Sequence, residues 1–253
     1  MKIALIGTGR IAWHLGKRLK SKGLAVSQVL GRTTSNVQAL AAHLGSNASS
    51  SWADIAPDTD WVLIAVKDDA IDDVAAALSA YVPMALATHT SGATPGTVLS
   101  PFFERYGVFY PLQTFSHERS PVWSKIPFCV DASNDSDLLF LKKMAKTIGN
   151  LVYQVDDEQR KQLHVAAVFA NNFANHCFSV AAQILDKHDL PFELLHPLME
   201  ETLAKALQDS PSSMQTGPAI RKDHDTINRH LSLLETEPLW QQIYAVMTES
   251  IQK

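Results

Sequence analysis

A glycine turn near the N-terminus is the first place where residue types and spacing could do chemistry. Residues 7–12 read Gly7-x-Gly9-x-x-Ala12, between the apolar run 3–6 and a helical apolar pattern. Strand, glycine turn and helix in this order are typical of a dinucleotide-binding fingerprint, although an ordinary glycine turn is the alternative. The glycines permit a tight turn and close approach of a pyrophosphate, which the helix N-terminus attracts. The residues expected to hold the pyrophosphate are Gly7, Thr8, Gly9, Arg10 and Ile11.

The tip of the next expected strand, residues 25–30, carries Arg32 with Thr33 and Ser35 beside it. A protein that selects NAD would have an Asp or Glu here, because a carboxylate accepts hydrogen bonds from the ribose hydroxyls. A guanidinium and hydroxyl groups suit a 2′-phosphate instead. The tip therefore predicts NADP as the cofactor and argues against a methyltransferase that uses S-adenosylmethionine. The alternative is a surface arginine in a polar loop.

Strands and helices alternate through the first hundred residues. Apolar runs at 61–66 and 84–88 predict two more strands, whereas residues 46–51 read as a polar connection with little order. The pattern predicts an α/β fold with a doubly wound, Rossmann-type, mostly parallel sheet. Ligands of such sheets lie at the carboxyl ends of the strands. The residues expected to border the ribose and nicotinamide are Val66, Lys67, Ser91 and Gly92.

The second half of the chain changes from strands to long helical periods. Three more strands are expected at 107–110, 127–131 and 151–155, and helices at 157–187, 191–208, 218–234 and 238–252. We therefore expect an NADP-binding Rossmann-like domain over residues 1–155, followed by a helical domain for substrate binding and dimerisation over 156–253. An apolar, all-helical second domain makes a symmetric homodimer the default expectation.

The long helix carries polar side chains that could act on a substrate. Positions 164, 168, 171 and 175 share one face of a regular α-helix, which groups His164 with Asn171 and Asn175. In one hypothesis they line a cleft opposite the nicotinamide, where the asparagines hold a substrate carbonyl and His164 donates a proton. Ser91 would complete this catalytic group. In the other hypothesis these polar groups satisfy buried backbone or the neighbouring domain.

Residues 215–223 are polar and lie just before and inside an expected helix, with Pro218 at its first position. Arg221 is a candidate for substrate binding or for a pair across a subunit interface. The carboxylates and histidines at 223–230 fit a solvated amphipathic helix better than a metal site, so no metal is expected.

Composition limits the class of protein. The 253 residues are 46% hydrophobic and carry a formal charge of −4, which gives no basic surface for nucleic acid or membrane binding. The longest apolar runs have the length of strands, and the first is needed in the core, so neither a membrane span nor a signal peptide is expected. Cys129 and Cys177 make no disulfide framework. We expect a cytoplasmic protein with a small-molecule substrate.

Several strings also carry a resemblance to known families. The first half resembles the dinucleotide domain of the 6-phosphogluconate dehydrogenase-like superfamily, particularly pyrroline-5-carboxylate reductase, through Gly7-Thr-Gly9, Arg32-Thr33, Ala65-Val66-Lys67 and Ser91-Gly92. Nearly the whole chain is similar to bacterial Rossmann-like proteins with a C-terminal DUF2520 domain. The strings that carry this likeness are His89-Thr-Ser-Gly92, Tyr110-Pro-Leu-Gln-Thr-Phe115, Asn171-Asn172-Phe173 and Gln215-Thr-Gly-Pro218. The resemblance implies an NADP-linked oxidoreductase whose helical domain often forms a dimer.

One departure from the related families concerns the mechanism. Related β-hydroxyacid dehydrogenases carry a catalytic lysine in a Lys-x-x-Asn pattern, and Val168 occupies that place here. His164, one turn earlier, is our candidate substitute. We predict an NADP-dependent oxidoreductase that moves hydride to or from a small carbonyl, imine or hydroxy compound. The alternative is an NADP(H)-binding regulatory or scaffold protein without turnover, and a deazaflavin-dependent reductase is a third, weaker hypothesis.

Overall fold

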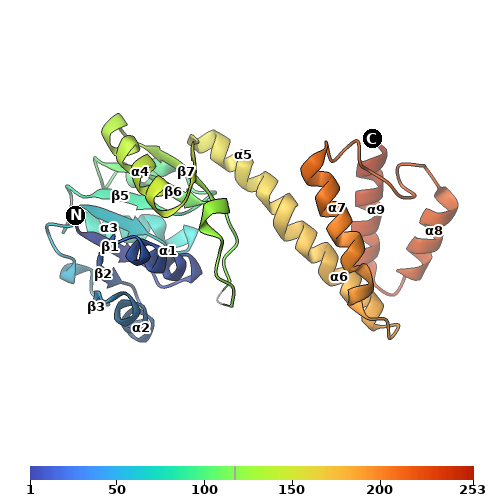
Figure 1. Cartoon of the computed structure of the whole chain (residues 1–253), viewed down its shortest axis with the longest axis horizontal. Coiled ribbons are helices and arrows are strands. Elements are labelled where there is room, and N and C mark those ends of the chain that lie inside the picture. Colours follow the sequence, from blue (N-terminus) through green and yellow to red (C-terminus); the bar gives the residue numbers. More distant parts are fainter. Residues whose placement is uncertain (117) are drawn as a thin grey trace. The chain divides into compact units, whose positions relative to one another are not determined.

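An eight-stranded sheet forms the frame of the N-terminal part of the chain (Figure 1). The computed structural model describes residues 1–116 and 118–253. The strand order is β3-β2-β1-β4-β5-β6-β7-β8, and neighbouring strands are parallel except for the antiparallel pair β6 and β7. The strands are β1 (Ile3–Ile6), β2 (Val26–Leu30), β3 (Asn47–Ser49), β4 (Trp61–Ile64), β5 (Leu86–His89), β6 (Tyr106–Pro111), β7 (Pro127–Ala132) and β8 (Leu151–Gln154). The predicted doubly wound, mostly parallel sheet is thereby confirmed.

Both faces of the sheet are covered, which explains its continuous apolar strands. Successive residues of β1 point to opposite faces, so Ile3 and Leu5 join one hydrophobic cluster while Ala4 and Ile6 join the other. The first cluster packs under α1 (Arg10–Ser21), α2 (Thr34–Leu44) and α4 (Asp135–Ile148), and the second under α3 (Ile71–Ser79). The helix after β1 and the helix after β4 therefore lie on opposite faces.

The structure adds one strand that the sequence did not predict. Residues 46–51 were expected to be an irregular connection, but β3 pairs in parallel with the outer edge of β2 through Gln28 and Asn47. An edge strand has one free side, and β3 consists of Asn, Ala and Ser that are mostly exposed. It therefore lacks the apolar run by which the inner strands could be recognised.

The long helix predicted over residues 157–187 is interrupted. It consists of α5 (Asp157–Ala167), a π-helix η5 (Val168–Phe173) and α6 (Ala174–Asp186). A π-helix closes hydrogen bonds between residues i and i+5, so it shifts the faces of the segments that it joins. Residues 164, 168, 171 and 175 share one face only in a regular α-helix, so the predicted common face does not apply to this interrupted helix.

The remaining helices are α7 (His196–Gln208), α8 (His224–Leu233) and α9 (Pro238–Gln252). The predicted helix over 218–234 was wrong at its start, because residues 218–222 form a turn and Asp223 is the N-cap of α8. The Asp223 carboxylate accepts a hydrogen bond from the Thr226 backbone N–H at 3.1 Å, as an N-cap does. Pro218 is therefore not a first helical residue.

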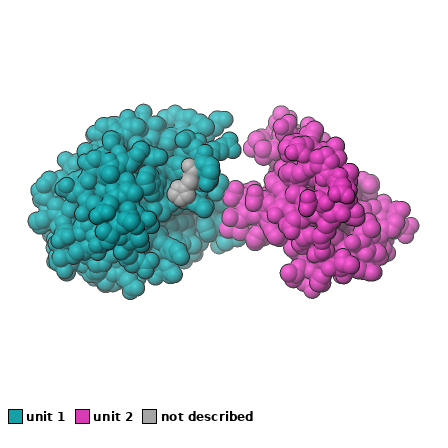
Figure 2. All heavy atoms as spheres, turned by 90° about the horizontal axis from the view of Figure 1, so that it is seen from below, with its two compact units in different colours: residues 1–167 teal, residues 168–253 magenta. Residues whose placement is uncertain are grey.

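The chain divides into two compact units, Met1–Ala167 and Val168–Lys253 (Figure 2). The first unit includes α5, which the sequence assigned to the C-terminal domain. The first turn of α5 is hydrogen-bonded to the segment after β5, since Asp157 accepts from the Gly96 N–H at 2.9 Å and Arg160 donates to the Thr94 carbonyl at 2.6 Å. Among the described residues, no helix has the length and apolarity needed to cross a membrane.

Candidate functional site

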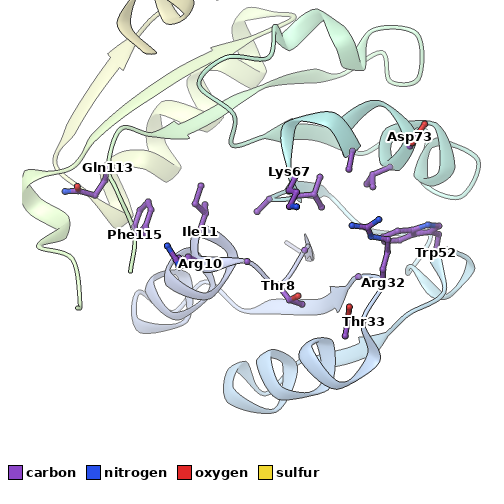
Figure 3. Close-up of a pocket in the computed structure, with 17 residues that line it drawn as sticks. Thr8, Arg10, Ile11, Arg32, Thr33, Trp52, Lys67, Asp73, Gln113 and Phe115 are labelled. Atoms are coloured by element: carbon purple, nitrogen blue, oxygen red, sulfur yellow. The ribbon is translucent and has the colours of Figure 1, made fainter. Parts of the chain in front are cut away.

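A pocket of about 660 Å³ opens at the carboxyl ends of β1, β2 and β4 (Figure 3). The strands β1 and β4 are neighbours, and the helices that follow them cover opposite faces of the sheet. Such a switch point leaves a crevice at the strand ends, where open α/β sheets bind their ligands. The size of the pocket lies within the range of small-molecule sites.

Two glycines shape the floor of the pocket in different ways. Gly7 has a φ of 109°, and a Cβ at this position would lie 2.4 Å from the Ala65 carbonyl oxygen. Only glycine fits this close approach of the loops after β1 and β4. Gly9 is the N-cap of α1, with φ −73° and ψ 178°, and no atom lies within 4 Å of a Cβ placed on it. The backbone at Gly9 is therefore open to the pocket.

The pocket carries a positive charge. Arg10, Arg32 and Lys67 line it together with one carboxylate, Asp73. Within residues 1–116 and 118–253, none of the three cations forms a salt bridge. The N-terminus of α1 adds its dipole, and no acidic residue occupies its first turn. This combination favours the phosphates of a dinucleotide.

The two ends of the pocket differ in chemistry. Figure 3 shows Arg32 beside Trp52 at one end, and Gln113 with Phe115 at the other. Phe115 is held by His14 of α1, whose ring stacks on it at 5.2 Å and whose Nε2 donates to the Ser116 carbonyl at 2.8 Å. An Arg–aromatic end and an amide–aromatic end could receive the two halves of one dinucleotide.

Sequence reasoning did not find all the lining residues. Trp52 and Asp73 reach the pocket from the segments after β3 and β4, and neither belongs to a strand tip. Gln113 and Phe115 follow β6 and lie in the string 110–115, a polar-aromatic loop for which the sequence predicts no binding role. That string, polar and aromatic directly after a predicted strand, was the one signal that could have located them.

The residues predicted for the cofactor fall into two groups. Those of the first, second and fourth strand tips line the pocket: Gly7, Thr8, Gly9, Arg10, Ile11, Arg32, Thr33, Val66 and Lys67. Ser35, Ser91 and Gly92 do not. Ser35 lies in the first turn of α2. The Ser91 hydroxyl accepts hydrogen bonds from the N–H groups of Ala93 and Thr94 at 3.1 and 2.9 Å, so it stabilises its own turn.

A second group of titratable residues lies buried behind that turn. His89 is fully buried, accepts from the Ser91 N–H at Nδ1 and lies 3.3 Å from the Pro95 carbonyl through Nε2. Burial lowers the pKa of His89 to about 4, with the Arg160 charge as a smaller cause. Burial also raises the pKa of Tyr110 to about 12 and that of Cys129 to about 11. These groups are held neutral at pH 7.

The residues predicted for the substrate are distributed over both units. His164 belongs to the first unit, half-buried, with its Nδ1 3.5 Å from the Tyr110 hydroxyl. Asn171 and Asn175 belong to the second unit and are exposed on η5 and α6. Arg221 is exposed in the turn before α8. The structure does not bring these four residues together within one unit.

Two of the four residues that the sequence offers as possible metal ligands, Asp223 and His230, have structural partners. Asp223 caps α8, and His230 Nδ1 lies 2.8 Å from the Tyr244 hydroxyl of α9. No group of three or more His, Cys, Asp or Glu residues able to hold a metal ion occurs in the part of the chain that the structure describes.

The strand order and the crevice at the β1–β4 switch point define a Rossmann-type α/β protein. Residues 2–85 match the family model described as "NADP oxidoreductase coenzyme F420-dependent", and residues 126–251 match the model of the domain of unknown function DUF2520. None of the curated proteins searched matches the chain.

Comparison with solved structures identifies a full-length relative. A Bacteroides fragilis protein described as "putative NADP oxidoreductase" is 39% identical, with 99% of this chain and 97% of that chain covered and a TM-score of 0.92. The chain belongs to this family, the Rossmann-like proteins with a DUF2520 domain that are described as NADP oxidoreductases.

Two more distant structures share the fold. An imine reductase from Myxococcus stipitatus in complex with NADP+ is 15% identical, with 100% of this chain and 93% of that chain covered and a TM-score of 0.73. A pyrroline-5-carboxylate reductase from Coxiella burnetii is 15% identical, with coverages of 99% and 98% and a TM-score of 0.62. At this identity the likeness concerns the fold alone.

Proposed function

We propose that the protein is an NADP-dependent oxidoreductase that transfers hydride between the nicotinamide and a small carbonyl, imine or hydroxy compound. The observation that carries the proposal is the cationic, glycine-floored pocket at the β1–β4 switch point. The family description supports NADP as the cofactor. NADP, when bound, supplies or accepts the hydride, and the protein orients it and manages the proton.

The backbone at Gly7, Gly9 and the α1 N-terminus would bind the pyrophosphate, since N–H groups and the helix dipole attract it there. Arg32 would bind the 2′-phosphate through charge-assisted hydrogen bonds, with Thr33 beside it. Trp52 lines the same end of the pocket and offers a flat apolar face for the adenine. The nicotinamide would then lie toward Val66, Gln113 and Phe115, with Ser91 and Gly92 in the loop beyond.

His164 is our candidate proton donor or acceptor on the substrate side, because imidazole is the side chain best suited to exchange a proton near neutral pH. His164 would take the catalytic role of the lysine that related β-hydroxyacid dehydrogenases carry at the place of Val168. Asn171, Asn175 and Arg221 remain proposed substrate ligands, and their exposed amides and guanidinium are free to bind polar groups.

We also propose that the C-terminal unit serves in dimerisation. In residues 168–253, all of which the structure describes, the buried hydrophobic residues are Ala219 and Ile227. Large apolar side chains of its helices are exposed instead, among them Leu198, Leu203, Leu207, Leu233, Leu239 and Val246. A unit of this size needs a buried core, and exposed apolar faces of this extent mark an interface. A second copy of the same chain is the partner that we propose.

A panel of small ketones, cyclic imines, hydroxy acids and a deazaflavin, assayed with NADPH or NADP+, tests the enzymatic proposal. We expect nicotinamide absorbance to change with at least one substrate class. His164→Ala should lower kcat roughly 10²–10⁴-fold, the usual contribution of a general acid, and leave NADPH binding unchanged. Tight NADPH binding without turnover on any compound would favour the alternative, an NADP(H)-binding regulatory or scaffold protein.

A further inference from the structure

Tyr110 and His164 meet at the carboxyl end of β6. Tyr110 is 8% exposed, its hydroxyl oxygen lies 3.5 Å from His164 Nδ1, and the two rings approach edge to face at 6.4 Å. Both residues belong to the first compact unit. The distance is at the long end for a hydrogen bond, and catalytic hydrogen bonds are often long in the free protein and shorten when substrate binds.

Gly92 makes this approach possible. A Cβ placed on Gly92 would lie 2.6 Å from His164 Nδ1 and 2.7 Å from the Tyr110 ring carbon that carries the hydroxyl. Any side chain at position 92 would therefore displace the His164 and Tyr110 rings from these positions. The Gly92 backbone and the Tyr110 ring therefore both lie against the Nδ1 side of the imidazole.

A buried arginine fixes the helix that carries His164. Arg160 is fully buried, and its Nη2 donates to the Thr94 carbonyl at 2.6 Å and to Asp157 Oδ1 at 2.7 Å. Asp157 Oδ1 in turn accepts from the Gly96 N–H at 2.9 Å. Arg160 and His164 lie four residues apart on α5, so the same face of the helix is held against the segment that contains Gly92.

We propose that Tyr110 is a positioning residue for His164: its hydroxyl oxygen accepts a hydrogen bond from Nδ1–H and leaves Nε2 to exchange the proton with the substrate. The inference rests on the proposed function of His164 and adds the residue that selects its tautomer. The nitrogen that carries the proton in a histidine is set by the hydrogen bond that the other nitrogen makes.

The proton step can be written for the reduction of a C=N or C=O group. NADPH, when bound, would supply the hydride that adds to the carbon, and the π electron pair would move to the nitrogen or oxygen. That atom takes the proton from Nε2 of the imidazolium, whose N–H electron pair stays on the ring. Neutral His164 then keeps Nδ1–H bonded to Tyr110, and a proton from water restores the imidazolium. Since the pKa of Tyr110 is raised to about 12, chiefly by burial, the phenol stays neutral throughout.

Nitrogen-15 NMR of the full-length protein tests the assignment, because the two nitrogens of a neutral imidazole give separate signals that identify the protonated one. The signals of His164 are identified among the ten histidines by their loss in His164→Ala. Free imidazole side chains favour the Nε2–H form. We expect His164 of the wild type to be in the Nδ1–H form, and Tyr110→Phe to return it to the Nε2–H form.

Tyr106→Phe is the matched control, since Tyr106 lies on the same strand and bonds Ser133 Oγ through its backbone N–H, which the substitution keeps. It should leave the His164 signals unchanged. An Nε2–H form in the wild type, or identical His164 signals in wild type and Tyr110→Phe, would overturn the proposal even if the protein proves to be an active oxidoreductase.

Kinetics separate the positioning role from a structural one once a substrate is known. We expect Tyr110→Phe to lower kcat about 10-fold, less than the roughly 10²–10⁴-fold expected for His164→Ala, with the NADPH dissociation constant unchanged. An unchanged kcat, or a weaker affinity for NADPH that accounts for the whole loss, would contradict the proposal. The NMR result stands without any substrate, so failure of the enzymatic proposal and failure of this one are distinguishable.

Discussion

His89, buried next to the Ser91 turn, makes the stability of the protein depend on pH. Its ring is buried, and burial lowers its pKa to about 4, whereas a histidine in an unfolded chain titrates near 6.5. Between these two values the unfolded chain binds a proton that the folded protein does not. The free energy of unfolding therefore falls as the pH falls from about 6.5 to about 4.

We predict that the free energy of unfolding falls by roughly 2 kcal/mol from pH 7 to pH 5 because of His89 alone. A difference of one unit between the folded and unfolded pKa corresponds to about 1.4 kcal/mol. Urea unfolding at the two pH values measures the loss. His89→Asn is less stable at both because it leaves a cavity, but its loss between pH 7 and pH 5 should be smaller by that amount. An equal loss in both proteins would show that His89 is not held neutral.

The residues of the candidate site could be predicted where they belong to a local pattern. Gly7, Gly9 and Arg32 follow strands directly, and each could be located from its neighbours in the chain. Gln113 and Phe115 could not, because they reach the pocket only through the placement of β6 in the sheet and through the contact of Phe115 with His14. Ser91 follows a strand as well, but its hydroxyl is used within its own turn.

At the scale of elements, the strand–turn–helix unit β1–α1 contains one glycine that the fold requires and another that only a bound cofactor would require. Gly7 is needed by the fold, because its φ is positive and Ala65 leaves no room for a Cβ. Gly9 is needed only by a ligand, because its φ and ψ suit any residue and no atom surrounds its Cβ position. The two glycines therefore form a matched pair for mutation.

We predict that Gly7→Ala destabilises the protein by at least about 2 kcal/mol, from backbone strain and the clash with Ala65. Gly9→Ala should keep the melting temperature of the wild type within a few degrees and lose NADPH binding, since the methyl group occupies the place of the pyrophosphate. Thermal unfolding and an NADPH titration of both variants decide this. Normal NADPH binding by Gly9→Ala would show that the pyrophosphate does not bind at this turn.

The elements that were missed lack a signal in the sequence for physical reasons. Inner parallel strands such as Trp61–Ile64 are apolar because both faces are buried, and this made them predictable. β3 is short, polar and at the sheet edge, so its pairing with β2 depends on tertiary structure. The π-helix Val168–Phe173 lies inside a continuous helical stretch, and its hydrogen-bond pattern distinguishes it from the α-helices on either side.

At the scale of the whole molecule, the apolar helices of the second unit bear on the oligomeric state. Leu207 of α7 and Leu233 of α8 are each 79% exposed. We predict that the wild type sediments as a dimer at micromolar concentration and that the double variant Leu207→Glu/Leu233→Glu sediments as a monomer, because buried carboxylates would oppose association. Leu139→Glu is the control, on a leucine of α4 in the first unit that is also largely exposed (70%), and should stay dimeric. A monomeric wild type would contradict the proposed interface.

The measurement that tests the central claim most directly is the titration of the wild type and Arg32→Ala with NADPH and NADH, followed by nicotinamide fluorescence. A hydrogen bond to a charged group contributes roughly 1.5–3 kcal/mol. We therefore expect the wild type to bind NADPH at least about 10-fold more tightly than NADH, and Arg32→Ala to lose most of that preference while binding NADH nearly as before. Lys22→Ala, at the far end of α1, should change neither affinity. Equal affinities for the two cofactors in the wild type, or binding of neither, would contradict the account.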